Sequence, residues 1–546
     1  MINIPRTVDV SHFDSTMNIG QSSGTEGHDI VWDPLWTGDW AKGPAGGYGT
    51  NEVTFTQNND IWRIKAGMVA ESTQWTVDWE KGEGTIVYKI RQGMRWALNP
   101  NSEASRLVNG REVTADDVIA NLERITTDPL TYLFSRQPEL RVAKITKTGP
   151  WEVSVKLPVG ALVPGITRFG QARIQPPEVF RKYGSLDNWR NSVGSGPFMR
   201  SEYVANSAIT YIRNPNYWMK DPIGPGKGNQ LPYLDSVRFL ILPDASTRQA
   251  ALRTGKIDQM PSLLLEDAKM MQTQVPALKS VASELGSATT TWMRSDKPPF
   301  SDVRVRRAMM MAIDFEAINQ GLYDGLAQIM TYPNVYSPSY PDIYVKPDDP
   351  DMHESVKELY TYNPEKAKQL LKEAGYPNGF KTSALAVASE VDEFSIYKDM
   401  WAKVGVELSI DVKEAGARTA LIIAAKHEGM TKSGGFPVAI WYTFPGIYGT
   451  ALQNSGMVND PIINEAYTKI NTQILIDEKE AMRQYRELRK HVLDQAYGIP
   501  QVVAPTYIFW WPWVKNYSGE VGTSYYTYNW PQFVWYDAEL KKSMGR

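Results

Sequence analysis

The chain has 546 residues, enough for two large lobes or for three to four domains. Its hydrophobic fraction of 42% and charged fraction of 22% are ordinary for a folded protein and argue against global disorder. The 58 basic residues nearly balance the 61 acidic ones, and the resulting net charge of -3 disfavours nucleic acid as a partner.

Strand patterns dominate the first third of the chain. Residues 85–91 and 151–157 alternate apolar and polar side chains, which predicts strands with one face against a core. Between them, Thr114-Ala-Asp-Asp117 has the pattern of a capping box, and the apolar face of a helix follows it. Together these patterns predict an α+β unit.

The pattern changes near residue 190. Residues 208–213 alternate as a strand, whereas residues 237–242 form a nearly continuous apolar run, which is typical of a strand covered on both faces. A third block starts near residue 300. Residues 301–314 place apolar side chains on one helical stripe and arginines off it, so we expect an amphipathic helix on a core. Its three consecutive methionines, Met309–Met311, are expected to fill that core.

Helix and strand patterns alternate in the last part of the chain. The clearest helix runs from Asn363 to Gly375, with Asn as N-cap, Pro in the first turn and Gly after the last turn. A strand is expected at 406–411 and a helix at 417–426, an alternation that is typical of an open α/β sheet. Residues 477–497 predict a long amphipathic helix.

Several classes of chemistry are disfavoured by composition. The chain has no cysteine, which excludes disulfides, thiolate metal sites and cysteine nucleophiles. Its five histidines are scattered without the i, i+4 spacing of a helical metal site, so we expect neither a metal nor a cofactor. The apolar runs are too short for a membrane helix, and the first residues do not resemble a secretory signal.

Short motifs give little support for an enzyme. Gly20-Gln-Ser-Ser-Gly24 matches the G-x-S-x-G pattern of serine hydrolases, but its flanks do not predict the strand and helix that this mechanism needs. Capping explains the adjacent carboxylates Asp116 and Asp117, and the glycine-rich residues 224–228 read as a loop. The 18 Trp and 28 Tyr suit ligand stacking as well as core packing. We therefore expect a binding protein, with a secreted hydrolase as the alternative.

Four groups of residues together resemble the family 5 extracellular solute-binding proteins of ABC importers, the dipeptide- and oligopeptide-binding group. Their order and spacing hold over essentially the whole chain. The groups are Phe300–Asp314, the pair Gly194–Phe198 and Arg213–Trp218, the turn and helix start Asn109–Val118, and the helix Tyr362–Tyr376.

The resemblance implies an α/β fold like that of periplasmic binding proteins, with two hinged lobes and an extra α+β domain inserted in the first. Lobe I is then expected from residues 1–35, 190–275 and 505–546, the inserted domain from 36–189 and lobe II from 276–504. It also implies a periplasmic or extracellular location, a lipid anchor lost from the trimmed chain, a permease of an ABC importer as partner, and a monomer.

The ligand is expected to be an oligosaccharide or another neutral solute. Peptide-binding members usually carry an aspartate three residues after a tryptophan, where it pairs with the peptide amine. Here Trp441 is followed at that distance by Phe444. A buried ammonium without a counter-charge costs several kcal/mol, whereas sugar faces stack well on aromatic rings. A peptide is the alternative, provided that another carboxylate holds its amine, and a metal chelate comes third.

The resemblance also suggests ligand-contacting residues from both lobes. A loop of the first lobe, Tyr132 after the capped helix, and Arg418 with an aromatic segment of the second lobe are expected to line the site. Packing for each aromatic, and a surface salt bridge for Arg418, are the alternatives. The expected residues are Gly20, Gln21, Ser22, Ser23, Tyr132, Arg418, Trp441, Tyr442, Thr443 and Phe444.

Overall fold

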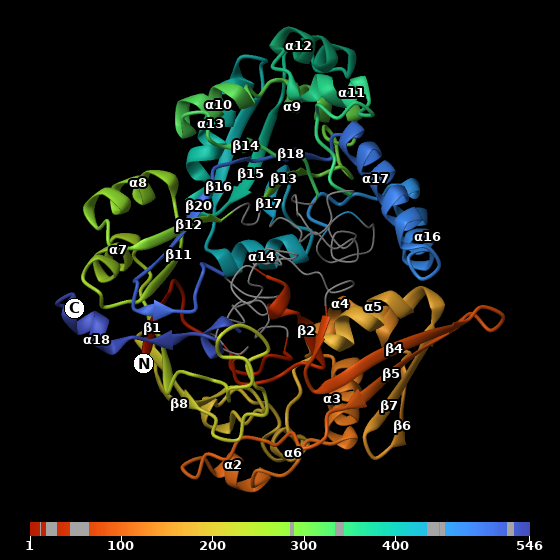
Figure 1. Cartoon of the computed structure of the whole chain (residues 1–546). Coiled ribbons are helices and arrows are strands. Elements are labelled where there is room, and N and C mark those ends of the chain that lie inside the picture. Colours follow the sequence, from red (N-terminus) through yellow and green to blue (C-terminus); the bar gives the residue numbers. More distant parts are fainter. Residues whose placement is uncertain are drawn as a thin grey trace. The chain divides into compact units, whose positions relative to one another are not determined.

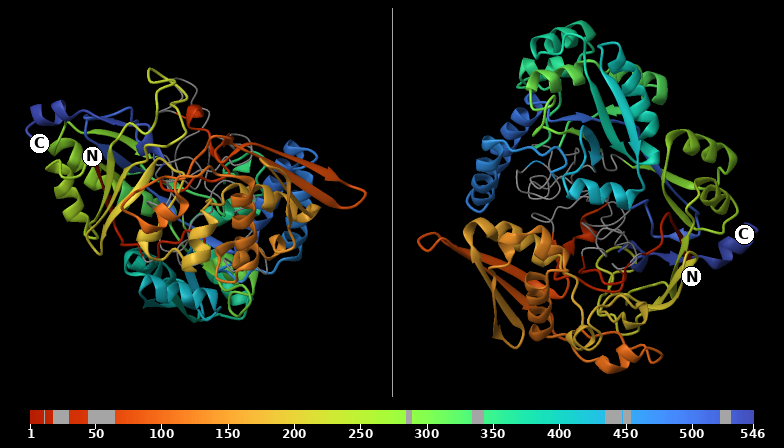
Figure 2. Two further views of the ribbon diagram at one scale, coloured as in Figure 1. Left: turned by 90° about the horizontal axis from the view of Figure 1, so that it is seen from below. Right: turned by 180° about the vertical axis from the view of Figure 1, so that it is seen from behind.

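The computed structural model describes residues 1–10, 12–17, 30–43, 65–283, 289–333, 343–433, 447, 454–520 and 529–546 (Figure 1). The chain divides into two compact units: unit 1 is Met1–Glu284 with Thr506–Arg546, and unit 2 is Leu285–Pro505. Both chain ends belong to unit 1 and lie near each other (Figure 2). The predicted three-segment lobe I and the inserted domain at 36–189 stay a prediction.

Unit 1 contains a four-stranded sheet of order β1-β10-β9-β8, in which β1 runs parallel to β10 and the other pairs are antiparallel. A second, antiparallel sheet has the order β11-β20-β12, and its central strand comes from the C-terminal segment. The strands are β1 (Ile2–Arg6), β8 (Phe198–Val204), β9 (Ala208–Arg213), β10 (Ser236–Ile241), β11 (Gln259–Leu263), β12 (Lys279–Ser283) and β20 (Thr506–Trp510).

A third sheet of unit 1 is antiparallel, with the order β4-β5-β7-β6, and the helices α3 and α5 pack against it (Figure 1). The strands predicted at 85–91 and 151–157 are its β5 and β7. The predicted capping box is confirmed, because Asp117 accepts a hydrogen bond from the backbone N–H of Thr114 at 2.8 Å. The bounds are β4 (Ala70–Asp78), β5 (Glu83–Ile90), β6 (Lys144–Gly149), β7 (Glu152–Pro158), α3 (Ala115–Thr127) and α5 (Val159–Gly170).

Strand β10 corrects one expectation. Val237, Phe239 and Ile241 are buried, but the side chains between them are only half buried. The strand is therefore fully covered on one face. The apolar residue Leu240 sits on the other face, and the uninterrupted run of the sequence concealed the alternation.

Unit 2 is built on one five-stranded sheet of order β16-β15-β17-β13-β18 (Figure 1). Strands β16 and β17 run parallel to β15, and β13 runs antiparallel to both of its neighbours. The predicted alternation of helix and strand is confirmed. The bounds are β13 (Thr290–Met293), β15 (Lys381–Ala386), β16 (Glu407–Val412), β17 (Met430–Ser433), β18 (Gly498–Pro500), α12 (Pro364–Glu373), α13 (Val391–Ala402), α14 (Ala415–Ile423) and α17 (Glu478–Asp494).

The core of unit 2 forms around α9 (Val303–Met311). Met309–Met311 are buried in it, as predicted. Arg306 was expected off the apolar stripe but is 3% exposed, because its guanidinium donates to the backbone carbonyls of Phe300 and Gln495 at 2.8 and 2.9 Å. A helical stripe shows which side chains are apolar, and the neighbouring backbone decides whether a charged one can be buried.

No helix in the described part of the chain is both long and apolar enough to span a membrane.

Shorter elements connect these sheets. The remaining helices and strands named in the figures or below are α2 (Glu103–Val108), α4 (Tyr132–Arg136), α6 (Pro177–Tyr183), α7 (Ala245–Arg253), α8 (Leu265–Gln274), α10 (Phe315–Tyr323), α11 (Glu354–Lys357), α16 (Pro461–Gln473), α18 (Ala538–Ser543), β2 (Trp36–Gly38), β3 (Lys65–Gly67), β14 (Gln328–Ile329), β19 (Val502–Val503), β21 (Val514–Lys515) and β22 (Trp535–Tyr536), with the 3-10 helices η1 (Trp40–Lys42) and η6 (Ala388–Glu390).

Candidate functional site

Three segments far apart in the chain meet at the carboxylate of Asp33, just before β2. Ser195, from the motif at 194–198, donates its hydroxyl to Asp33 Oδ2 at 3.3 Å. Trp218, from the motif at 213–218, donates its indole N–H to the same oxygen at 3.1 Å. Two of the motifs that carried the family resemblance therefore fold together around one buried acid.

Close backbone contact explains the glycines of the first motif. A Cβ on Gly194 would lie 1.8 Å from the carbonyl oxygen of Val31, and one on Gly196 would lie 2.7 Å from the carbonyl carbon of Val31. The N–H of Gly196 donates to that carbonyl at 2.9 Å. Asn214 donates its side-chain N–H to the carbonyl of Gly196 at 2.8 Å, which joins the second motif to the first. These contacts fix Ser195 beside Asp33.

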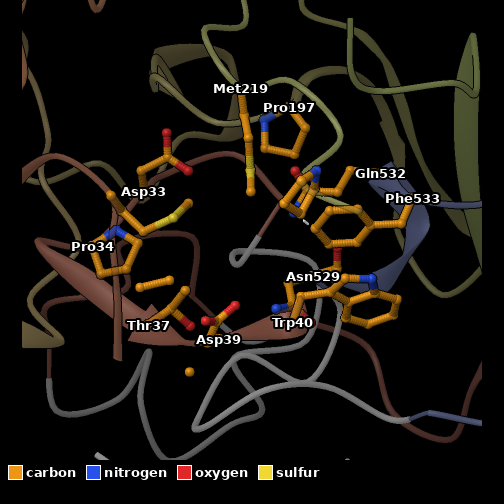
Figure 3. Close-up of a pocket in the computed structure, with 14 residues that line it drawn as sticks. Asp33, Pro34, Thr37, Asp39, Trp40, Pro197, Met219, Asn529, Gln532 and Phe533 are labelled. Carbon is orange, nitrogen blue, oxygen red and sulfur yellow. Dashed lines mark hydrogen bonds between the residues drawn. The ribbon is translucent and has the colours of Figure 1, made fainter. Parts of the chain in front are cut away.

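Asp33 lines a cavity of about 90 Å³ within unit 1 (Figure 3). Trp40 and Phe533 lie on the opposite side, and their rings stack with centroids 4.3 Å apart and planes 10° apart. Met219 and Gln532 also line the wall. The cavity thus has an acidic side and an aromatic side.

The charge of Asp33 has little compensation. The residue is 2% exposed, and this burial raises the pKa of Asp33 to about 6, although the hydrogen bonds from Trp218 and Ser195 and the charge of Arg91 act in the opposite direction. The Arg91 guanidinium donates instead to the carbonyls of residues 67–68, at 3.0 and 2.9 Å, and stacks over the Trp218 ring. Among the residues described, none forms an ion pair with Asp33.

Tyr132, one of the predicted residues, opens α4 in unit 1. Its backbone N–H donates to the carbonyl of Thr16 at 2.9 Å, and Thr131 pairs with Met17 in an isolated β-bridge. The Tyr132 side chain is half buried. Tyr132 therefore lies beside the segment that leads into residues 18–29. Four predicted residues in that range lie outside the described part of the chain: Gly20, Gln21, Ser22 and Ser23. The G-x-S-x-G match lies outside it as well.

Arg418 lies on α14, at the edge of the unit 2 sheet where the parallel strands β15, β16 and β17 end. It forms an ion pair with Glu390 of η6 at 2.7 Å. At the same edge Lys432, at the end of β17, is paired with Glu393 of α13. In open α/β sheets, ligands bind outside the carboxyl ends of the strands. The chain then continues from β17 toward Trp441, Tyr442, Thr443 and Phe444, which also fall outside the described residues.

Sequence reasoning missed Asp33. The signal was present, because Asp33 is the single acidic residue in the otherwise apolar stretch Ile30–Leu35. A charged side chain in such a stretch is either exposed at a turn or buried with hydrogen-bonding partners. Only the tertiary packing shows that Asp33 is buried and that Ser195 and Trp218 are its partners.

The histidines do not form a metal site in the described part of the chain, where no three His, Asp or Glu side chains gather around one point. His427 is buried and contacts the carbonyl of Ser455 at 2.8 Å, and its burial lowers the pKa of His427. His491 contacts Asp460 at 2.7 Å. Both rings are held by neighbours within unit 2.

The chain matches the family described as bacterial extracellular solute-binding proteins, family 5 Middle, over residues 66–459. The chain belongs to this family. The predicted family, the two-lobe α/β fold class, and the function as a solute-binding protein of ABC importers are thereby confirmed. Family 5 proteins act outside the cytoplasm, at the cell surface or in the periplasm.

Individual relatives differ in their ligands. The chain is 35% identical over 190 residues to heme-binding protein A of Haemophilus influenzae, a match that spans 35% of this chain and 30% of that protein. It is 25% identical over 448 residues to the glutathione-binding protein GsiB of Shigella flexneri, covering 77% of each. The structure of DppA from Helicobacter pylori in complex with the peptide STSA superposes with a TM-score of 0.75 at 20% identity, covering 98% of each chain.

Proposed function

We propose that this family 5 protein captures a peptide or peptide-like solute between its two lobes and delivers it to the permease of an ABC importer. The carrying observation is the match of 98% of the chain to a peptide-bound DppA. The relation to a glutathione-binding protein over 77% of the chain adds to it, because glutathione is itself a peptide. The oligosaccharide predicted from the sequence has no such support among these relatives.

The proposed ligand contacts come from both units. Unit 1 supplies Tyr132 and the loop from Gly20 to Ser23, which follows the segment that Tyr132 contacts. Unit 2 supplies the edge at the carboxyl ends of its parallel strands, with Arg418 and the segment from Trp441 to Phe444. The position of Arg418 at this edge supports a contact with the ligand, and its ion pair with Glu390 holds the Arg418 guanidinium at that edge.

The proposed mechanism is a shift between open and closed states. A ligand that touches both lobes only in the closed state stabilises that state by its differential affinity. The permease then recognises the closed protein, and no bond of the ligand is broken. We further propose that the protein works as a monomer and is anchored to the membrane by lipid in its native form.

Native mass spectrometry of the purified protein tests the ligand class. A series of peptide masses that disappears on denaturation supports the proposal, whereas a single sugar mass overturns it in favour of the oligosaccharide. Small-angle scattering with a bound ligand is expected to show a smaller radius of gyration. An unchanged radius with a confirmed tight ligand contradicts closure.

The alternative of a hydrolase is tested separately. Generic ester and glycoside substrates should give no turnover above background. Sustained turnover that disappears in Ser22→Ala would establish a serine hydrolase and overturn the assignment as a binding protein only.

A further inference from the structure

Asp33 is a buried carboxylate with one oxygen still available. Oδ2 accepts from both Ser195 and Trp218, whereas Oδ1 accepts no hydrogen bond from any residue that the structure describes. A buried carboxylate with so few partners is costly unless something else satisfies it. Because Asp33 lines the cavity, the missing partner can reach it from there.

The groups around Asp33 do not neutralise its negative charge. Arg91 is the cation that acts on it, and its N–H groups are directed to the carbonyls of residues 67–68. Tyr217, whose pKa is raised well above its usual value by burial, faces the same acid as a neutral hydroxyl. Asp39 lines the same cavity and caps η1 through the N–H of Ala41, so it adds negative charge.

The shape of the cavity suits a small alkylammonium group. A volume of about 90 Å³ corresponds to roughly three water molecules, since a water occupies about 30 Å³ of liquid. The stacked rings of Trp40 and Phe533 on the far side give an apolar and π-electron surface, which attracts organic cations and contacts alkyl chains. Met219 adds a polarisable thioether to the wall.

We propose that this cavity of unit 1 is a subsite for a primary ammonium group, with the Asp33 carboxylate as its counter-charge and the Trp40–Phe533 pair beside its alkyl part. The proposal deepens the proposed function, on which it rests for the source of the amine. A peptide supplies that amine from its N-terminus or from a lysine side chain. The subsite answers the question left by Phe444, namely which carboxylate holds the amine of a peptide.

The first experiment uses n-butylammonium and its neutral counterpart n-butanol, detected by saturation-transfer NMR on the full chain. We expect a signal from the butyl protons of the ammonium that is at least tenfold stronger than from the alcohol. Asp33→Asn should remove this difference. Asp258→Asn is the matched control, because Asp258 is also buried in unit 1 but is already paired with Lys541 at 3.3 Å, and it should retain the difference.

Acidity gives a test on the unmodified protein. With the pKa of Asp33 at about 6, ammonium binding should weaken about tenfold between pH 7 and pH 5, because only a tenth of the carboxylate is then ionised. Equal signals from ammonium and alcohol, or an ammonium signal that persists in Asp33→Asn, overturn the proposal.

The second experiment compares Ala-Ala-Ala, N-acetyl-Ala-Ala-Ala and N-acetyl-Ala-Lys-Ala by calorimetry. If the N-terminus occupies the subsite, acetylation should weaken binding at least tenfold in the wild type and have no effect in Asp33→Asn. If a lysine occupies it, N-acetyl-Ala-Lys-Ala should bind and lose affinity in Asp33→Asn. Peptide binding that is unchanged in Asp33→Asn overturns the subsite and leaves the proposed peptide function in place. Butylammonium binding without any peptide binding supports the subsite and overturns the peptide function.

The melting temperature distinguishes a purely structural role for Asp33 from a ligand-binding role. If the carboxylate served only to hold Ser195 and Trp218, Asp33→Asn should lower the melting temperature at pH 8. If it is kept for a ligand, the variant should lose ammonium binding and melt at a higher temperature.

Discussion

Asp33 in unit 1 and Lys432 in unit 2 are buried charges that differ in their compensation. In unit 1, Asp33 is 2% exposed and has only neutral donors as hydrogen-bond partners. In unit 2, Lys432 is 4% exposed and is paired with the Glu393 carboxylate, and Arg418 is paired with Glu390. A paired charge is satisfied within the protein, whereas an unpaired buried charge lowers stability and is available to a ligand.

This contrast predicts whether removing each buried charge raises or lowers the free energy of unfolding. Removing one member of a pair leaves the other uncompensated and must destabilise the fold. Removing the unpaired Asp33 charge relieves a cost and must stabilise it. The four variants below test the contrast, from the largest expected effect to the smallest.

Lys432→Met should have the largest effect. It leaves Glu393 partly buried without its cation, next to the hydroxyl of Tyr397 that donates to it at 2.8 Å. Breaking a buried pair costs about 3 to 5 kcal/mol of unfolding free energy. Urea unfolding followed by tryptophan fluorescence measures it. A loss below about 1 kcal/mol would show that Glu393 is well solvated without Lys432 and would weaken the contrast.

Asp33→Asn should raise the unfolding free energy by about 3 kcal/mol at pH 8, since burial raises the pKa of Asp33 from 3.8 to about 6 and each pKa unit corresponds to about 1.4 kcal/mol. The folded protein holds the Asp33 proton up to a pKa of about 6, above the usual 3.8. Wild-type stability therefore falls as the pH rises between these two values, and the full penalty is present above pH 6. The advantage of the variant should disappear near pH 4. Denaturant titrations at pH 8 and near pH 4 measure the unfolding free energies of the wild type and the variant. A variant less stable than the wild type at pH 8 contradicts the interpretation of Asp33 as an unpaired buried charge.

Arg418→Gln should cost about 1 kcal/mol, less than Lys432→Met, because the Arg418 and Glu390 side chains are 19% and 13% exposed and water partly replaces the lost partner. Glu390 also caps η6 by accepting from the N–H of Val387 at 3.0 Å, and that bond remains in the variant. Thermal unfolding measures the change. A loss as large as that of Lys432→Met would mean that the edge of the sheet depends on Arg418 more than its exposure indicates.

Lys147→Ala should change stability by less than about 0.5 kcal/mol. Lys147 is paired with Asp116 at 2.7 Å, but the two side chains are 42% and 69% exposed. Exposed pairs are screened and lose side-chain entropy on forming. This variant sets the baseline in the same denaturation series, and a large effect here would show that exposure is a poor guide to the energetics of these pairs.

Much of the secondary structure followed from local patterns. The helix after Asn363 begins with Pro364 in its first turn, as its N-cap and proline predict, and Asn363 accepts the N–H of Lys366 at 3.0 Å. The capping box at Thr114 formed for the same reason, since its hydrogen bonds join residues three apart. Interactions this short in sequence are visible in the sequence.

The candidate site was less predictable. Tyr132 and Arg418 could be named from the resemblance, but their partners Thr16 and Glu390 could not, because they lie 116 and 28 residues away along the chain. Asp33 was missed altogether. Its hydrogen bonds to Ser195 and Trp218 span 162 and 185 residues, and no local pattern contains them.

The sequence by itself determined the helices and strands, the family and the class of function, because caps, periodicity and motif order are encoded in neighbouring residues. Only the tertiary structure decided which buried charges are paired with an opposite charge and which, like Asp33, are not. The Arg306 guanidinium is buried because carbonyls from Phe300 and Gln495 converge on it, and the Asp33 carboxylate is unpaired because Arg91 is bound elsewhere. The electrostatics of a buried group depend on what lies within a few ångströms in space, and that distance is set by the fold.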